Sequence, residues 1–283
     1  MKKTKKNGEQ FLLLPVLPLR GLILYPGVVA PVLLGRKSSL AALAIAQKIA
    51  VSGDTQIFAI AQRNSEIEEP TVQQLYDVGV VARIISVSML PGGMAKVMLE
   101  GVVAAHVEEW IAPQGSKDEH LMARVEPLGL LRTADFSDEM RSRLLKLFKE
   151  YAEMRNDIPV EAIQAIDSYP TEMFLYSMAP FIIASEEMRQ KLLECVDALR
   201  FATIIRKLIH EAIAVRQLDR RVEQEVQQEI SRHQREYLIQ EHIRRLGEEL
   251  EDPTKSLSPE VAAIRQKIDQ TPLTEEARTS AIE

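Results

Sequence analysis

The side chains in this sequence with the clearest chemical potential are one cysteine, five histidines and pairs of adjacent glutamates. A thiolate can be a nucleophile, histidines can bind zinc or move protons, and paired carboxylates can act as general acid and base. Cys195 stands at helical spacing from Leu192, which favours a small buried apolar residue over a nucleophile. The histidines form no i, i+4 pair. Neighbours such as Glu68 and Glu69 point apart, so solvated charge is their better interpretation.

Motifs for phosphate and acyl-transfer chemistry are missing from the sequence. No Gly-Lys pair occurs anywhere, so there is no phosphate loop of the form G-x-x-x-x-G-K-[ST]. There is also no G-x-S-x-G nucleophile elbow. We therefore expect no catalytic residue, no cofactor site and no metal site in this segment.

Two groups of apolar residues suggest hydrophobic binding instead. One surrounds a hairpin turn, where polar residues are usual, and consists of Met89, Leu90, Pro91 and Met94. The other clusters around two prolines and consists of Tyr169, Met173, Phe174, Tyr176, Met178 and Phe181. Methionine adapts to varied apolar partners, so Met89, Met94 and Met178 are candidate binding residues, together with Leu90 and Pro91. Core packing is the alternative for both groups and is favoured for the second.

Composition bounds the class of protein. The length of 283 residues suggests about two domains, and the net charge of −6 argues against nucleic acid as the main partner. A single cysteine excludes an internal disulfide framework and fits the cytoplasm. Four early lysines before the apolar run 11–19 imitate a signal peptide, but Pro15 and Pro18 break that run. No apolar stretch approaches the roughly 18 residues that span a membrane.

The first half of the chain has the pattern of a β domain. Residues 1–10 are expected to be a disordered basic tail. Residues 11–132 contain about six alternating or apolar runs and one helical run, separated by Pro- and Gly-rich turns. This pattern predicts a small, mostly antiparallel barrel or sandwich.

The second half is helical. Residues 133–197 have several short amphipathic runs, and 198–250 form one proline-free run that must be a very long, protruding helix. Its first third is rich in apolar residues and should be buried in a bundle, whereas the rest carries a thin apolar stripe. The pattern leaves open a lever or a dimerising coiled coil. Residues 251–283 are expected to be a linker and further helix that stops without a C-terminal cap, as in a piece of a longer chain.

Several segments together resemble one family. LPVLPLRGLILYPGVVAPVLLGR resembles the opening of the N-terminal domain of bacterial Lon proteases, and DVGVVARI and KVMLEG look like later strands of it. QREYLIQEHIRRLGEEL is similar to a Q-R-E-Y-Y-L-x-E-Q segment late in that family's long helix. The order of these pieces covers about residues 11–283.

The resemblance implies an α+β fold: a PUA-like β domain, then a helical bundle with the long helix. It implies the N-terminal part of a cytoplasmic, homohexameric, ATP-dependent serine protease that captures unfolded or degron-bearing proteins for quality control. ATP and Mg²⁺ would be used by an AAA+ module beyond this segment, which itself would be inactive. Substrate contacts would then involve the candidate apolar residues, Met89 and Met178 included.

The resemblance has two departures. Gly21 stands where the family often has aspartate, and Leu238 replaces the second tyrosine of the Y-Y pair. Arg235, Tyr237 and Leu238 are the residues expected at contacts between subunits or at the hexamer entrance. The alternative function is that of a stand-alone PUA-like module that binds protein or nucleic acid. DNA binding through this segment and membrane association are not expected.

Overall fold

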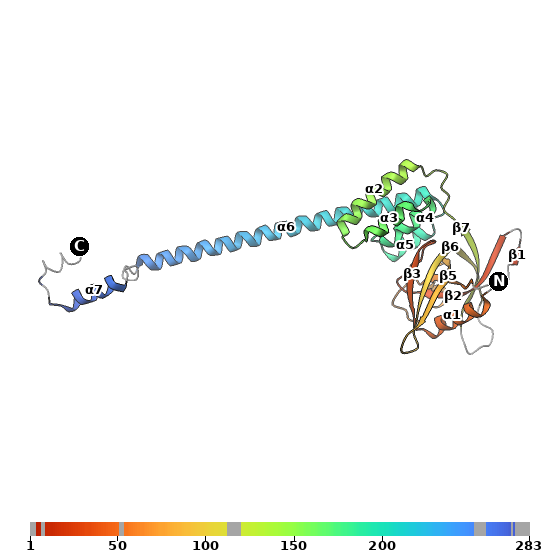
Figure 1. The fold of residues 1–283 in the computed structure, drawn as a ribbon, viewed down its shortest axis with the longest axis horizontal. Coiled ribbons are helices and arrows are strands. Elements are labelled where there is room, and N and C mark those ends of the chain that lie inside the picture. The colour runs from red at the N-terminus through yellow and green to blue at the C-terminus, as the bar shows by residue number, and fades with distance from the viewer. Residues whose placement is uncertain are drawn as a thin grey trace. The chain divides into compact units, whose positions relative to one another are not determined.

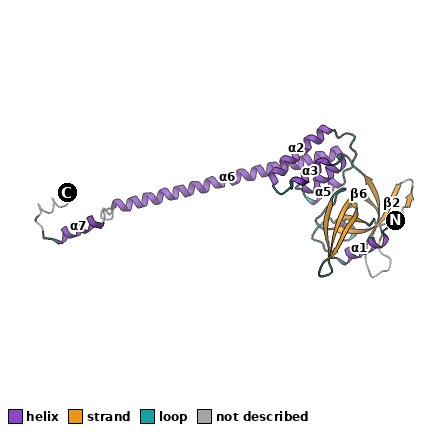
Figure 2. Ribbon diagram, viewed as in Figure 1, coloured by secondary structure: helices purple, strands orange, loops and turns teal. Residues whose placement is uncertain are grey.

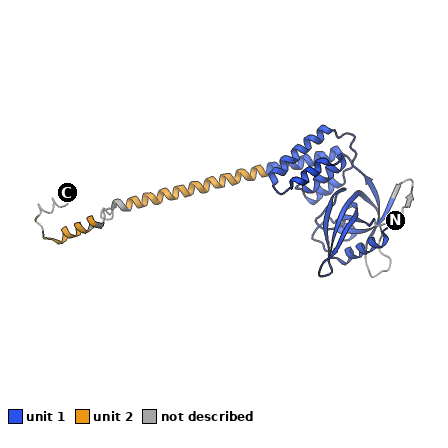
Figure 3. Cartoon of the chain, in the orientation of Figure 1, with its two compact units in different colours: residues 1–215 blue, residues 216–283 orange. Residues whose placement is uncertain are grey.

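The computed structural model describes residues 4–6, 9–50, 54–111, 120–251, 259–272 and 274. The chain divides into two compact units, residues 1–215 and residues 216–283 (Figure 3). In the first unit a β-sheet precedes a group of helices (Figures 1 and 2). The predicted α+β class, with a mostly antiparallel sheet followed by helices and one very long helix, is confirmed.

The alternating apolar runs of the first half form strands. The strands are β1 (Thr4–Lys6), β2 (Glu9–Leu19), β3 (Val29–Leu34), β4 (Gln56–Ala61), β5 (Val78–Met89), β6 (Ala95–Ile111) and β7 (Met122–Gly129). One α-helix, α1 (Lys37–Ile49), and a short 3-10 turn, η1 (Val72–Gln74), lie between them.

The described strands close into a ring. β2 pairs in parallel with β4; β4 with β5, β5 with β6 and β6 with β7 pair antiparallel; β7 then pairs antiparallel with β2. β3 lies outside this ring, antiparallel to the first part of β6, with Val29 opposite Glu100 and Leu34 opposite Ala95. Each of these five strands thus pairs with two neighbours in the ring, and β2 does so along its length, with β7 over Leu12–Pro15 and with β4 over Val16–Leu19.

The strands separate two apolar cores. Along β2, Leu14 and Val16 belong to one core, and Leu17 and Leu19 to the other, as the two-residue period of a strand requires. The first core draws on all five ring strands and on no helix, so it fills the inside of the ring. The second continues through α1 into the helical part of the unit, which therefore packs on the ring as one body with it.

Amphipathic runs form the helices of the second half. They are α2 (Asp138–Arg155), α3 (Val160–Ser168), α4 (Thr171–Met178), the 3-10 turn η2 (Ala179–Phe181), α5 (Glu186–Leu193), α6 (Ala198–Glu251) and α7 (Pro259–Gln270). The Ser137 hydroxyl accepts a hydrogen bond from the Met140 N–H at 3.3 Å and so begins α2. The Asp197 carboxylate likewise accepts a hydrogen bond from the Arg200 N–H at 3.0 Å and so begins α6.

Tyr25 joins the ring to the helices. Its hydroxyl donates to the Arg189 carbonyl at 2.8 Å, and its ring centre lies 6.3 Å from that of Tyr176. Beside it, the buried Gln190 side chain donates to the Val78 carbonyl at 2.9 Å. Buried polar groups with partners of this kind fix one relative placement of two layers.

A second junction connects the last strand to the start of α6. The Arg132 N–H donates to the Val196 carbonyl at 2.9 Å, and the Ala198 N–H donates to the Arg132 carbonyl at 3.0 Å. Residues 133–197, with α2 to α5, therefore leave the sheet and return to the point from which they left.

The first part of α6 is a core helix, as predicted from its apolar density. Phe201, Ile205 and Ile209 are fully buried, and the Phe201 ring packs edge-on against Tyr176 at 5.4 Å. From Val215 to Leu246, the large apolar side chains of the helix are exposed. No described helix is long and apolar enough to cross a membrane.

The structure differs from expectation at the N-terminus. Residues 1–10 were expected to be a disordered tail, but Thr4–Lys6 pairs antiparallel with β2, which already begins at Glu9. Backbone pairing along β2 needs no apolar side chains, so the polar composition gave no sign of it. The predicted linker after α6 lies outside the described residues at 252–258, as does nearly all of the helix expected from residue 274.

Alkaline pH is expected to destabilise the first unit. Burial raises the pKa of Tyr25 and of Tyr176 well above the ordinary value near 10. Above about pH 10 the unfolded chain releases these protons while the native state keeps them. The free energy of unfolding is therefore unaffected by these two groups below about pH 10 and falls above it, by about 1.4 kcal/mol per pH unit for each tyrosine. Urea unfolding between pH 8 and 11 measures this. Tyr25→Phe should make the fall shallower; an equal slope in that variant would contradict the prediction.

Candidate functional site

The hairpin between β5 and β6 ends in open space. The Leu90 N–H donates to the Met94 carbonyl at 2.8 Å and closes the turn. Gly92 and Gly93 adopt φ of 84° and 78°, the left-handed region that favours glycine. No described atom would lie within 4 Å of a Cβ placed on Gly92 or on Gly93, so the two glycines of the turn face open space.

The four residues predicted around this turn lie together at its tip. Met89 is 68% exposed and Met94 is 43% exposed; Pro91 is also exposed, and Leu90 is half-buried. Met94 lies over the end of β3, where a Cβ on Gly35 would be 3.7 Å from its Cγ. The tip is therefore an exposed apolar surface, and its role in binding stays a prediction.

The edge strand β3 extends this surface and was missed in the sequence. Its outward positions, Val29, Pro31 and Leu33, are exposed, and Leu33 reaches 66%. β3 pairs only with β6 among the described strands, so these residues stand at a sheet edge. The signal that could have found them is Pro31, because proline within a strand marks an edge.

The two parts of this surface flank the hairpin on opposite sides. Met89 is opposite Ala95, which is opposite Leu34, and this row faces the core side of the sheet. Leu33 and Lys96 form the next row, which faces away. We call Leu33, Met89, Leu90, Pro91 and Met94 the tip surface. Exposed apolar side chains therefore stand on both faces of the sheet at this end, Met89 on one face and Leu33 on the other.

Met178 does not belong to any exposed surface. It is fully buried in the core that the helices share with the sheet. Phe174 and Tyr176, which belong to the same group of apolar residues around two prolines, are buried there as well. It therefore cannot contact a bound partner in this fold, and the core-packing interpretation holds for these three residues. Tyr169, at 42% exposure, is the member of the cluster that remains accessible.

The residues predicted at subunit contacts lie on the second unit's part of α6. Tyr237 is 68% exposed, Leu238 is 64% exposed, and Arg235 is also exposed. Their side chains are available for contact, and their contact with another subunit stays a prediction.

The reactive side chains singled out in the sequence can be located in the described part of the structure. Cys195 is buried, and burial raises the pKa of its thiol, so it is not an activated nucleophile. Within the described part of the chain, no three His, Cys, Asp or Glu residues gather as metal ligands would. On the strands of the hairpin, Arg83 forms ion pairs with Asp54 and with Glu100, at 3.1 Å each. The surfaces described here are suited to binding.

Comparison with known proteins agrees with this architecture. Residues 13–211 match the family model described as the ATP-dependent protease La (LON) substrate-binding domain. The chain belongs to this family. The matched residues cover the ring, the helices α2 to α5 and the buried first part of α6, which are the parts that pack as one unit.

Relatives of the LON family cover most of this chain. It is 33% identical over 257 residues to the Lon protease of Cytophaga hutchinsonii, which is 88% of this chain and 30% of that protein. It is 28% identical over 270 residues to the Lon protease of Escherichia coli K12, 95% of this chain and 33% of that protein. The chain therefore spans about a third of the length of these relatives.

A solved structure shares the fold. The N-terminal domain of the Mycobacterium avium complex Lon protease aligns with a TM-score of 0.54 at 19% identity, and the alignment covers 70% of this chain and 98% of that one. The LON resemblance in the sequence is thus confirmed by the family model and by relatives along nearly the whole chain.

Proposed function

We propose that this chain captures unfolded or degron-bearing polypeptides on the tip surface, as the substrate-recognition part of an ATP-dependent serine protease. The observation that carries this proposal is the exposure of Met89, Met94 and Leu33 at the end of the sheet. The name of the family, a substrate-binding domain, supports a polypeptide ligand.

The tip surface is suited to chains that have lost their fold. Folded proteins bury most large apolar side chains, whereas unfolded chains present them to solvent. Burying one such side chain fully contributes about 1.5–3 kcal/mol, and partial burial at an open tip contributes less. Several weak apolar contacts at adaptable methionines give broad selectivity for exposed hydrophobic segments, because thioether side chains repack easily.

Removing the apolar side chains of the tip should weaken this binding. The variant Leu33→Ser, Met89→Ser, Met94→Ser is expected to bind an unfolded probe about tenfold more weakly, which corresponds to about 1.4 kcal/mol. The probe is reduced, carboxymethylated α-lactalbumin, with affinity measured by fluorescence anisotropy. Since all three residues are exposed, the melting temperature should change little.

A matched variant separates the tip from general surface apolarity. Leu130, Val160 and Ile183 are 51%, 63% and 58% exposed elsewhere on the same unit. Their triple serine variant removes comparable apolar side chains and is expected to bind the probe as the unchanged chain does. Equal weakening in both triple variants, or none in the tip variant, would remove the tip as the site.

The assembly and chemistry of the whole protease are part of the same proposal. We infer a cytoplasmic homohexamer in which Arg235, Tyr237 and Leu238 help to contact neighbouring subunits, supported by the exposure of Tyr237 and Leu238 on α6. ATP and Mg²⁺ would serve the AAA+ module of that parent protein and not the residues of this chain. Protein quality control follows as the role, because capture of unfolded chains would feed their degradation.

A further inference from the structure

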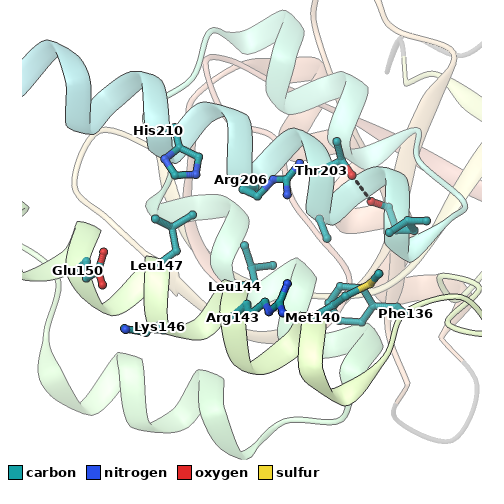
Figure 4. Close-up of a pocket in the computed structure, with 12 residues that line it drawn as sticks. Phe136, Met140, Arg143, Leu144, Lys146, Leu147, Glu150, Thr203, Arg206 and His210 are labelled. Carbon is teal, nitrogen blue, oxygen red and sulfur yellow. Dashed lines mark hydrogen bonds between the residues drawn. The ribbon is translucent and has the colours of Figure 1, made fainter.

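A second possible binding surface is a groove between α2 and the first part of α6. Its volume is about 490 Å³, and all of its lining residues belong to the first unit (Figure 4). Leu144 and Leu147 point from α2 toward α6, and Ala202 comes from α6 itself. Met140, at 41% exposure, and Leu199, at 38%, also line the groove and are accessible to a ligand.

The rim of the groove is mostly cationic. Arg143 and Lys146 of α2 and Arg206 of α6 line it, against the single acidic lining residue Glu150. Arg143 bonds Glu139 at 2.6 Å. Within the described part of the chain, Lys146 and Arg206 form no salt bridge, so the two helices present unneutralised positive charge beside an apolar floor.

One polar group of the groove is already bonded within its own helix. The Thr203 hydroxyl donates to the Leu199 carbonyl of its own helix at 2.8 Å (Figure 4). Apart from His210, the remaining uncharged lining is apolar and includes half-buried Leu147 and buried Phe136. The occupant must therefore supply apolar side chains for the floor and negative charge for the rim.

We propose that this groove binds a helical polypeptide segment, one turn or more in length, with apolar side chains along one face and aspartate or glutamate beside that face. Two helices with an apolar furrow between them accept a third amphipathic segment, whose acidic side chains then meet Lys146 and Arg206. Partly exposed pairs of this kind add modestly to affinity but strongly to selectivity, because a basic segment would bring like charges together. The groove thus selects acidic apolar segments, whereas the tip surface selects by apolarity alone.

A pair of synthetic peptides tests this on the full 283-residue chain. Both are fluorescein-labelled and about 15 residues long, with leucine at helical spacing; one carries glutamate between the leucines and the other lysine. The glutamate peptide is expected to bind at least about tenfold more tightly than the lysine peptide at low salt. The preference should shrink at 0.5 M NaCl, where partly exposed charges are screened.

Charge reversal assigns the preference to the groove. Lys146→Glu, Arg206→Glu should abolish the preference for the glutamate peptide, whereas the tip variant Leu33→Ser, Met89→Ser, Met94→Ser should keep that preference. Lys149→Glu, Lys207→Glu is the matched control, with the same charge change on the same two helices but outside the groove. It should retain the preference. Circular dichroism verifies that both variants keep their helices.

Three outcomes would overturn the inference. They are equal binding of the two peptides, an equal loss of preference in both double variants, and a chain that dimerises through Lys146 and Arg206 but binds no peptide. The third would show that the groove holds a second copy of the chain. The peptide pair tests the groove and the unfolded probe tests the tip surface. An error in one proposal can therefore be told apart from an error in the other.

Discussion

Ile205→Asp is expected to destabilise the first unit strongly at 25 °C, whereas Ile230→Asp, 25 residues further along the same helix, is expected to change stability little. Ile205 is fully buried in the core shared by sheet and helices, and Ile230 is 45% exposed. A buried carboxyl without a partner must be desolvated or protonated, and the lost apolar packing adds to this, for a total of about 4 kcal/mol or more. That is a large part of the stability of a typical domain.

Urea unfolding of the two variants, followed by tyrosine fluorescence and circular dichroism, measures the difference. Ile230→Asp should stay within about 0.5 kcal/mol of the unchanged chain. Comparable losses at both positions would contradict the assignment of α6 to a core segment and an exposed segment. A loss at Ile230 that grows with protein concentration would instead locate a contact between chains on the exposed stripe.

Gly101→Ala is expected to lower the free energy of unfolding by about 3 kcal/mol, near the upper end for an overpacked core. A Cβ at Gly101 would lie well inside van der Waals contact with the Tyr25 carbonyl oxygen and 2.8 Å from its carbonyl carbon. Backbone cannot rotate away as a side chain can. The two segments are also held together, since the Gly101 N–H donates to the Val28 carbonyl at 2.9 Å. Displacing Tyr25 would further weaken its hydrogen bond to Arg189.

Gly35→Ala is the control for Gly101→Ala. At Gly35 a Cβ would meet Met94 at 3.7 Å, an ordinary contact, and the backbone is not left-handed. We expect a change of less than about 1 kcal/mol. Thermal unfolding of both variants decides the matter: similar melting temperatures would mean that β6 and the segment at Tyr25 can move apart without loss.

Local patterns in the sequence predicted the features that depend on neighbouring residues. Pro91-Gly92-Gly93 between two alternating runs predicted the hairpin and its apolar tip, because turn chemistry and strand period act within a few residues. The dense apolar spacing from Phe201 to Ile209 predicted the buried start of α6. Met89 and Met94 were found in this way as well.

Features that depend on distant segments could not be predicted in the same way. The parallel pairing of β2 with β4 and the closure through β7 are set by which strands meet, and the period of a strand does not encode its partner. Met178 and Met89 are alike in type, and only the packing of α4 makes one core and the other surface. The groove needs Lys146 and Arg206, which are far apart in sequence, to lie on two facing helices.

The hydrogen bonds between Arg132 and the start of α6 have a mechanical consequence. Tension applied along α6 would reach the sheet through the paired backbone of Arg132, Val196 and Ala198 before it could stretch anything between them. Residues 133–197 form a loop closed by those bonds, and α2 to α5 within it are held further by their packing in the shared core. A pulling measurement on this chain should therefore record one event for the rupture of this clamp, followed by a longer extension as the shielded helices α2 to α5 unravel.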